Sequence, residues 1–325
     1  MARIYYPTRS DEAARLLKGE GTELLAGGTD VLDRVHHGVL APTTLVNLRR
    51  VPGLEGVREE GHALVVGART TLLDVSEHAA VRARLPVLAE AAEHTATPQI
   101  RVLATVGGAL CQRPRCVYLR HPDYRCRKQG GSVCYAMDGD NAAHALFDNE
   151  LCAAVHPSTV GAALLALDAA IDVRLEDGSA RALPVADFFR LDARDPRQVR
   201  KENALPDGAL VEAVRVPLPT RPTLQRYLRA SPRLLADWAE VEVAVCLSLS
   251  GDVIERARIV LGAVGRVPRR AEASERALAG GRLDTARIEQ AARLAAEGAR
   301  PLSHNAHKVA LCQGIVRAAL EEVRA

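Results

Sequence analysis

The spacing of apolar residues divides the chain into short strands and helices of ordinary length. Segments with the 3.6-residue period of a helix cover residues 11–19, 31–38, 71–80, 85–94, 160–166, 271–279, 285–297 and 307–323. Short apolar or alternating runs typical of strands cover residues 23–26, 44–47, 63–67, 171–175, 180–183, 210–216, 225–228, 240–249 and 254–261. Asp177-Gly178 predicts a hairpin turn between two of these strands. The pattern predicts an α+β fold.

A proline-rich stretch at residues 217–222, PLPTRP, is the predicted domain boundary. A chain of 325 residues can form two cores, and we place a first domain at residues 1–218 and a smaller α+β domain at residues 219–325. The net charge of +3 gives no general attraction to nucleic acid. Because the chain has no apolar run of membrane-span length and no apolar signal region at its N-terminus, we expect a cytoplasmic protein.

Two pairs of glycines stand at breaks between predicted elements. The first belongs to the stretch Gly-Gly-Thr-Asp at 27–30, directly before a predicted helix that its Thr or Asp can cap. The second, Gly107-Gly108, ends a segment that begins after the helix-breaking Pro98. Such pairs let backbone N–H groups approach a phosphate closely, and they also occur in plain tight turns. Two pairs in one domain favour one long, phosphate-bearing ligand that spans both.

Five of the seven cysteines lie in residues 105–152. They are Cys111, Cys116, Cys126, Cys134 and Cys152. Six Arg or Lys residues lie between positions 113 and 128, opposed over that span by Asp123 alone. A segment so rich in Cys, Gly and Arg has too few large apolar side chains to order itself by burial. We therefore expect a bound group to hold it.

The spacing of these cysteines leaves three interpretations open. Disulfides need an oxidising compartment, and nothing marks the chain as secreted. Structural zinc is typically held by closely spaced cysteine pairs, and the chain has no CxxC. An iron–sulfur cluster tolerates wider and irregular spacing, and the basic run suits its negative charge. We rank a cluster above zinc, and zinc above plain buried cysteines.

Five motifs occur in an order that resembles one protein family. They are AGGTD at 26–30, TVGGAL at 105–110, HPS at 156–158, ADWAEVEVAV at 236–245 and PLSHNAHKV at 301–309. Together they resemble the FAD-binding medium subunit of molybdenum hydroxylases, which include xanthine dehydrogenases, aldehyde oxidoreductases and carbon monoxide dehydrogenase. The resemblance covers nearly the whole chain. It implies a two-lobed FAD-binding domain of the vanillyl-alcohol-oxidase type, followed by a small α+β C-terminal domain.

The resemblance also implies which residues bind cofactors, and it implies no catalytic residue on this chain. The residues implied for FAD are Ala26, Gly27, Gly28, Thr29, Asp30, Thr105, Gly107, Gly108, Asp237 and Trp238. One branch of the family carries an extra [4Fe–4S] cluster in this subunit, and the cysteine segment resembles that branch. The implied ligands are Cys116, Cys126, Cys134 and Cys152, with Cys111 left free.

Two residues depart from the family pattern. Ala109 stands where relatives often have Asn, and Thr159 stands where they have Asp. Each change removes a polar contact worth about 1 kcal/mol, so FAD binds more weakly unless a neighbouring residue compensates.

The remaining histidines and cysteines are expected to have structural roles. Four histidines show no ligand spacing with one another and are expected at surface or capping positions: His36, His37, His144 and His304. Cys246 lies in an apolar strand and Cys312 in a helix, where cysteine packs as a small hydrophobic residue.

The leading functional hypothesis is an electron-transfer flavin subunit. A large subunit with the molybdenum cofactor would oxidise an aldehyde, xanthine or N-heterocyclic substrate, and a small subunit with [2Fe–2S] clusters would relay the electrons to FAD on this chain. The chain has no residues for molybdenum, so we expect it not to hydroxylate substrate alone. The alternative is a zinc-stabilised binding module whose basic cysteine loop docks an acidic partner or nucleic acid.

Overall fold

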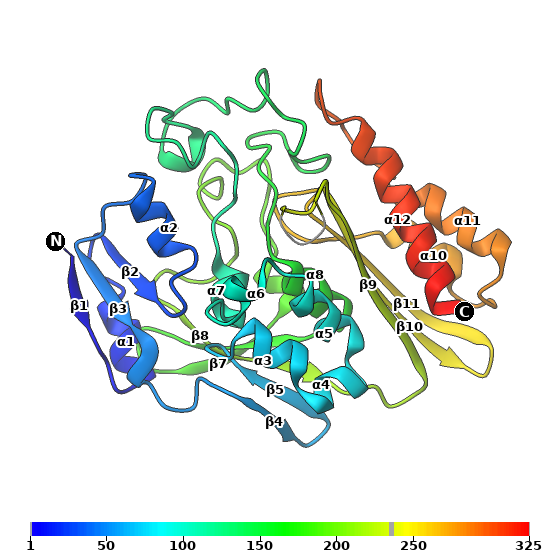
Figure 1. Ribbon diagram of the computed structural model, residues 1–325, viewed down its shortest axis with the longest axis horizontal. Helices are drawn as coiled ribbons and strands as arrows, with labels where there is room; N and C mark the ends of the chain where they lie inside the picture. The colour runs from blue at the N-terminus through cyan, green and yellow to red at the C-terminus, as the bar shows by residue number, and fades with distance from the viewer. Residues whose placement is uncertain (1, 234–236, 325) are drawn as a thin grey trace.

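In the part of the chain that the structure describes, three sheets, each with its own helices, make up the fold (Figure 1). The computed structural model describes residues 2–233 and 237–324. A three-stranded and a five-stranded sheet form two lobes in the first part of the chain, and a four-stranded sheet belongs to the C-terminal part. This arrangement confirms the predicted α+β class. Among the described residues, no helix combines the length and apolar character needed to cross a membrane.

The first lobe is a parallel sheet in the order β1-β3-β2 with short helices beside it. Its elements are β1 (Arg3–Tyr5), α1 (Ser10–Leu16), β2 (Thr22–Leu25), α2 (Val31–His36), β3 (Thr44–Asn47) and the 3-10 helix η1 (Leu48–Arg50). Ala13 and Ala14 of α1 are fully buried and share a small core with Val46 of β3. The chain leaves β2 directly into the first glycine pair, so the sheet fixes where that pair lies.

The second lobe is an antiparallel sheet in the order β4-β5-β8-β6-β7. Its strands are β4 (Val57–Glu60), β5 (Ala63–Gly67), β6 (Ala170–Arg174), β7 (Ala180–Pro184) and β8 (Leu210–Pro217). Its helices are α3 (Leu72–Glu77), α4 (Ala79–Arg84), α5 (Pro86–Glu93), α6 (Pro98–Arg101), α7 (Val106–Cys111), α8 (Thr159–Ala166) and α9 (Val185–Phe188). Every residue of α8 is buried, and Ser158 caps it by accepting a hydrogen bond from Gly161 N at 3.1 Å.

The C-terminal sheet has the order β12-β11-β10-β9 and is covered on both faces. Its elements are β9 (Thr223–Ala230), β10 (Val241–Ser250), β11 (Val253–Gly262), β12 (Arg269–Arg270), α10 (Glu272–Leu278), α11 (Thr285–Leu294) and α12 (His307–Arg324). One face packs on α5 and α8, and the other on α10 and α12. This double burial explains the long apolar run of β10, and it confirms that Cys246 and Cys312 are buried packing residues.

Several elements differ from those predicted. The helix predicted over 71–80 is divided at His78, whose extended backbone ends α3 before α4 begins. Pro98 begins α6, because its missing N–H costs nothing in the first turn of a helix. Gly107-Gly108 lies inside the first turn of α7, and not at the end of a strand or loop. Short elements such as β1, β4, β12 and α9 are too brief to show a clear period in the sequence.

The chain between α7 and α8 is mostly irregular and carries one short 3-10 helix, η2 (Arg127–Gln129) (Figure 1). It has a small core that was not predicted, since the rings of Tyr118, Tyr124 and Tyr135 pack with centroids 4.9, 5.1 and 5.9 Å apart. Phe147 joins the core of the C-terminal domain. The segment therefore has more aromatic packing than expected, and the expectation of a bound group stays a prediction.

Part of the polar stretch at residues 192–208 packs against the cysteine segment. Glu202 is 6% exposed and pairs with Lys128 at 2.7 Å and with Arg113 at 3.2 Å. The basic run is thus balanced by carboxylates from other parts of the chain, and Glu202 holds the two segments together.

Candidate functional site

The first glycine pair joins β2 to α2 and packs tightly against the chain after α6. A Cβ atom on Gly27 would lie 1.8 Å from the carbonyl oxygen of Leu103. Gly28 has a φ of +77°, in the left-handed region that glycine adopts without strain. Only glycine at position 27 allows this close approach of two backbone segments.

The second pair occupies the N-terminal turn of α7. Thr105 caps this helix, because its hydroxyl accepts a hydrogen bond from Gly108 N at 3.2 Å. A Cβ atom on Gly107 would lie 2.9 Å from the Cβ of Ala68, after β5. The glycines therefore let α7 lie close to the second lobe.

Both glycine pairs line one cavity of about 390 Å³, which we call the glycine cavity. It brings together eight of the residues implied for FAD: Ala26, Gly27, Gly28, Thr29, Asp30, Thr105, Gly107 and Gly108. The cavity also has polar walls that were not predicted, formed by Arg34, Arg69, Gln112 and Asp207. These residues come from four separate places in the chain, and no local motif marks them.

Asp30 connects the glycine cavity to the cysteine segment. It occupies the N-cap position of α2 but makes no capping hydrogen bond with its side chain, in contrast to the prediction. Its carboxylate pairs with Arg120 at 2.6 Å, and with Arg115 and Arg34 at 3.2 Å each. Although burial opposes ionisation, these cations hold the pKa of Asp30 below its ordinary value.

Replacing Asp30 by Asn should loosen both regions that it joins. The variant leaves three partly buried guanidinium groups without their shared carboxylate, which should lower the free energy of unfolding by about 2 kcal/mol. Urea denaturation followed by circular dichroism measures this loss. Asp123→Asn is the control, because its side chain is 85% exposed and its nearest basic partner, His121, is 3.7 Å away. Equal stability of both variants would contradict the connecting role of Asp30.

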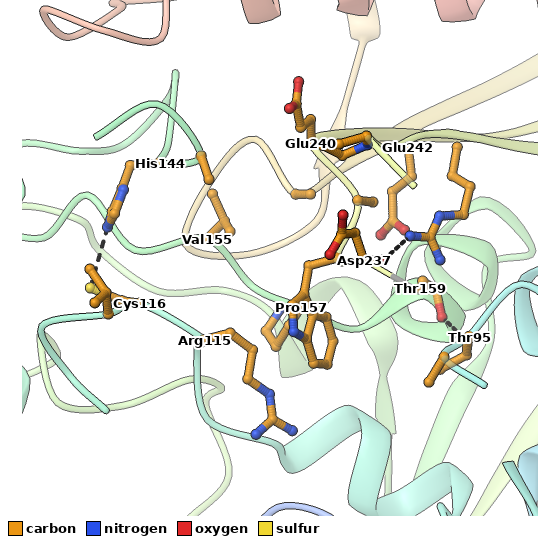
Figure 2. Close-up of a pocket in the computed structure, with 18 of the residues that line it drawn as sticks. Thr95, Arg115, Cys116, His144, Val155, Pro157, Thr159, Asp237, Glu240 and Glu242 are labelled. Atoms are coloured by element: carbon orange, nitrogen blue, oxygen red, sulfur yellow. Dashed lines mark hydrogen bonds between the residues drawn. The ribbon is translucent and has the colours of Figure 1, made fainter. Parts of the chain in front are cut away.

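Asp237 and Trp238 line a separate cavity of about 600 Å³, which we call the Trp238 cavity. Figure 2 shows the residues around it, with Asp237 labelled. Ala236, the first residue of their motif, lies outside the described residues. Trp238 is 50% exposed, and the guanidinium of Arg115 lies 4.8 Å from the centre of its ring. Trp238 is thus an open aromatic surface and not part of the core. Because Arg115 also pairs with Asp30, it links the two cavities.

Thr159, one of the two departures from the family pattern, also lines the Trp238 cavity. Its hydroxyl is hydrogen-bonded to the hydroxyl of Thr95 (Figure 2). Thr95 therefore gives the buried hydroxyl of Thr159 a hydrogen-bond partner. Ala109, the other departure, is buried in α7.

Glu242 is a buried acid in the wall of the Trp238 cavity that was not predicted. It is 1% exposed and accepts a hydrogen bond of 2.6 Å from the hydroxyl of Tyr227. Burial raises the pKa of Glu242 to about 7, while the bond from Tyr227 and the charge of Arg229 oppose the rise.

Glu242→Gln should remove a pH dependence from the stability of the protein. Because the folded-state pKa of about 7 lies above the ordinary 4.5, protonated Glu242 favours the fold. Its contribution is complete below pH 4.5 and is lost as the pH rises through about 7. The free energy of unfolding of the wild type, relative to Glu242→Gln, should fall by about 3 kcal/mol across this range. Urea titrations at several pH values measure it, and parallel curves for the two proteins would contradict it.

Four of the cysteines gather at one place. Cys116, Cys126, Cys134 and Cys152 line one small cavity, the cysteine cavity, while Cys111 lines the glycine cavity instead. All seven cysteines are free thiols, so the disulfide interpretation is wrong for this structure. Within residues 2–233 and 237–324, no three Cys, His, Asp or Glu side chains form a group that could hold a metal ion.

The thiols of the cysteine cavity differ in acidity. A hydrogen bond from Cys152 lowers the pKa of Cys134 to about 6. Burial raises the pKa of Cys116 to about 11. Cys134 is therefore readily available as a thiolate, whereas Cys116 needs a nearby cation to lose its proton.

His144 is not a surface residue, in contrast to the prediction. It is 7% exposed, and its Nε2 lies 3.3 Å from Cys116 Sγ (Figure 2). Burial lowers the pKa of His144 to about 4, so the ring is neutral at pH 7. The other three histidines of that group, His36, His37 and His304, are exposed as expected.

Comparisons with known proteins identify the family. Residues 1–219 match the family model described as the FAD binding domain in molybdopterin dehydrogenase, and residues 226–323 match the CO dehydrogenase flavoprotein C-terminal domain. The aldehyde oxidoreductase FAD-binding subunit PaoB of Escherichia coli K12 is 30% identical, with 98% of this chain and 96% of the relative covered. The carbon monoxide dehydrogenase medium chain of Hydrogenophaga pseudoflava is 29% identical, covering 97% and 94%.

A solved structure shows the same fold. Carbon monoxide dehydrogenase from Hydrogenophaga pseudoflava, in a form that lacks the Mo-pyranopterin moiety, matches with a TM-score of 0.77 and 27% identity, and the match covers 99% of this chain and 97% of the other. Matches of this length include both the FAD-binding lobes and the C-terminal domain, as the sequence motifs implied. The chain belongs to the family of FAD-binding flavoprotein subunits of molybdenum hydroxylases, and electron transfer through FAD is its function.

Proposed function

We propose that FAD lies across the glycine cavity and the Trp238 cavity, with its pyrophosphate at the glycine pairs and its flavin ring near Asp237 and Trp238. The observation that carries this proposal is that both glycine pairs line one cavity, which Arg115 links to the second. Bound FAD supplies a carrier that exchanges electrons singly or in pairs. For FAD, this chain supplies the close backbone approach at the glycine pairs, the cation of Arg115 and the aromatic surface of Trp238. We keep the proposed division into domains at residues 1–218 and 219–325.

We also propose that Cys116, Cys126, Cys134 and Cys152 ligate one [4Fe–4S] cluster. Four thiolates are the usual complete ligand set of such a cluster. The same four cysteines line one cavity together with Arg127, whose positive charge suits an anionic cluster. The cavity is small, so binding a cluster requires this irregular segment to widen. Zinc would need three or more ligands grouped around a single ion.

The proposed partners are a large subunit with the molybdenum cofactor and a small subunit with [2Fe–2S] clusters. Support comes from the names of relatives, which are FAD-binding subunits or medium chains of aldehyde oxidoreductase, carbon monoxide dehydrogenase and xanthine dehydrogenase. We propose an aldehyde or an N-heterocycle such as xanthine as the substrate of the assembled complex. We propose the cytoplasm as its compartment.

Reduction of the flavin by substrate tests this function. In the complex with its two partners, rapid mixing with an aldehyde or xanthine under anaerobic conditions should bleach the flavin absorption within one turnover. The isolated chain should show no bleaching, because we propose that molybdenum is bound by the large subunit. Sedimentation of the co-expressed subunits should show them together. A chain that stays separate from such partners and oxidises substrate alone would overturn the proposal.

A further inference from the structure

His144 touches a proposed cluster ligand from a position that the rest of the chain fixes. Its Nε2 lies 3.3 Å from Cys116 Sγ, within the range for a hydrogen bond to sulfur. His144 is only 7% exposed, so little of this contact is open to water. Figure 2 shows the imidazole of His144 directed at Cys116.

The C-terminal helix holds the backbone at His144 in place. Lys308 is fully buried, and its ammonium group donates hydrogen bonds to the carbonyl oxygens of His144 at 2.9 Å and Ala263 at 2.8 Å. Asn305, also fully buried, donates from its side-chain amide to the carbonyl of His144 at 3.1 Å. A buried ammonium is costly unless its hydrogen bonds are satisfied, and here carbonyl oxygens satisfy it. The motif at 301–309 thus positions residue 144.

Cys116 differs from the other three proposed ligands because it borders two cavities. It is the one described residue that lines both the cysteine cavity and the Trp238 cavity. His144 lines the Trp238 cavity beside it, and the ring atom Nδ1 is buried without a hydrogen-bond partner. The contact between His144 and Cys116 therefore lies at the wall between the proposed cluster and the proposed flavin ring.

We propose that His144 is a positioning residue that donates its Nε2–H to the Cys116 thiolate and raises the reduction potential of the cluster. The proposal rests on the cluster ligation set out above. Reduction adds negative charge to a cluster, and a hydrogen bond to a ligating sulfur stabilises that charge. Because Cys116 forms the wall toward the flavin, the bond acts on the ligand closest to the electron partner. His144 thereby favours the reduced state of the cluster in its exchange with FAD.

Two substitutions of His144 distinguish the effect of its hydrogen bond from the effect of the packing of its ring. His144→Gln keeps a side-chain N–H donor, whereas His144→Met fills similar space without one. His304→Leu is the control, because His304 belongs to the same C-terminal motif but its side chain is exposed. All variants are prepared anaerobically in the complete complex with partner subunits, and their iron and FAD contents are measured first.

The deciding measurement is a redox titration of the cluster followed by electron paramagnetic resonance. His144→Met should keep its iron and shift the midpoint potential to more negative values, by at least tenfold in the equilibrium constant, or about 59 mV for one electron. His144→Gln should restore most of the shift, and His304→Leu should match the wild type. A wild-type potential in His144→Met overturns the inference, and so does loss of iron in both His144 variants. A wild type that binds no iron refutes the cluster itself instead.

Discussion

Gly27→Ala should release FAD from the purified protein. The added Cβ would lie 1.8 Å from the carbonyl oxygen of Leu103, so one of two backbone segments must move. Both segments border the glycine cavity, and a displacement of the loop removes the close approach that a pyrophosphate needs. We expect FAD occupancy to fall about tenfold or more, which corresponds to a loss of about 1.4 kcal/mol or more in binding. Absorption after gel filtration gives the FAD content.

Substitutions at two other glycines serve as comparisons for Gly27→Ala. Gly28→Ala should be milder, because the new Cβ meets the flexible end of Leu32 at 2.9 Å and adds backbone strain of about 1–2 kcal/mol at a positive φ. Gly314→Ala should keep full FAD, because a Cβ there has no atom within 4 Å and the site lies in α12. If Gly27→Ala retains as much FAD as Gly314→Ala, the pyrophosphate binds elsewhere.

Serine at Cys116, Cys126, Cys134 or Cys152 should remove the cluster. A hydroxyl is a far poorer ligand for iron than a thiolate, so each variant should lose most of about four iron atoms per chain. The flavin should be affected as well, because Arg115 and Arg120 of the same segment pair with Asp30 in the glycine cavity. Iron and FAD analysis of each variant measures both losses.

Cys111→Ser is the matched control for these four variants. Cys111 lies in the same stretch of sequence but in α7, where it lines the glycine cavity and not the cysteine cavity. Iron content should stay at the wild-type level. An iron-free Cys111→Ser protein, together with full iron in any one of the other four variants, would mean that the ligand set is wrong.

Features set by a few neighbouring residues could be predicted from the sequence. Gly27 is needed because a backbone segment lies where its Cβ would be. A glycine pair directly after a predicted strand indicates such a position in the sequence. The strand predicted over 240–249 also rests on a local pattern, its long apolar run, and it matches β10. The order of such motifs along the chain then indicated the family.

Features that depend on distant contacts could not be predicted. The backbone at His144 is held by a hydrogen bond from Lys308, which is 164 residues away in the chain. The sequence around His144 gives no sign of this contact. The basic run seemed unbalanced because its partners are distant, with Asp30 90 residues from Arg120 and Glu202 74 residues from Lys128. Tertiary packing determines both the position of His144 and the carboxylate partners of the basic run.

The most direct test of the central claim, that one chain holds both FAD and a [4Fe–4S] cluster, is flavin and metal analysis of anaerobically purified protein together with its absorption spectrum. We predict one FAD and about four iron atoms per chain, with visible absorption from both groups. A protein that contains zinc in place of iron, or FAD with no metal at the four cysteines, would contradict the claim.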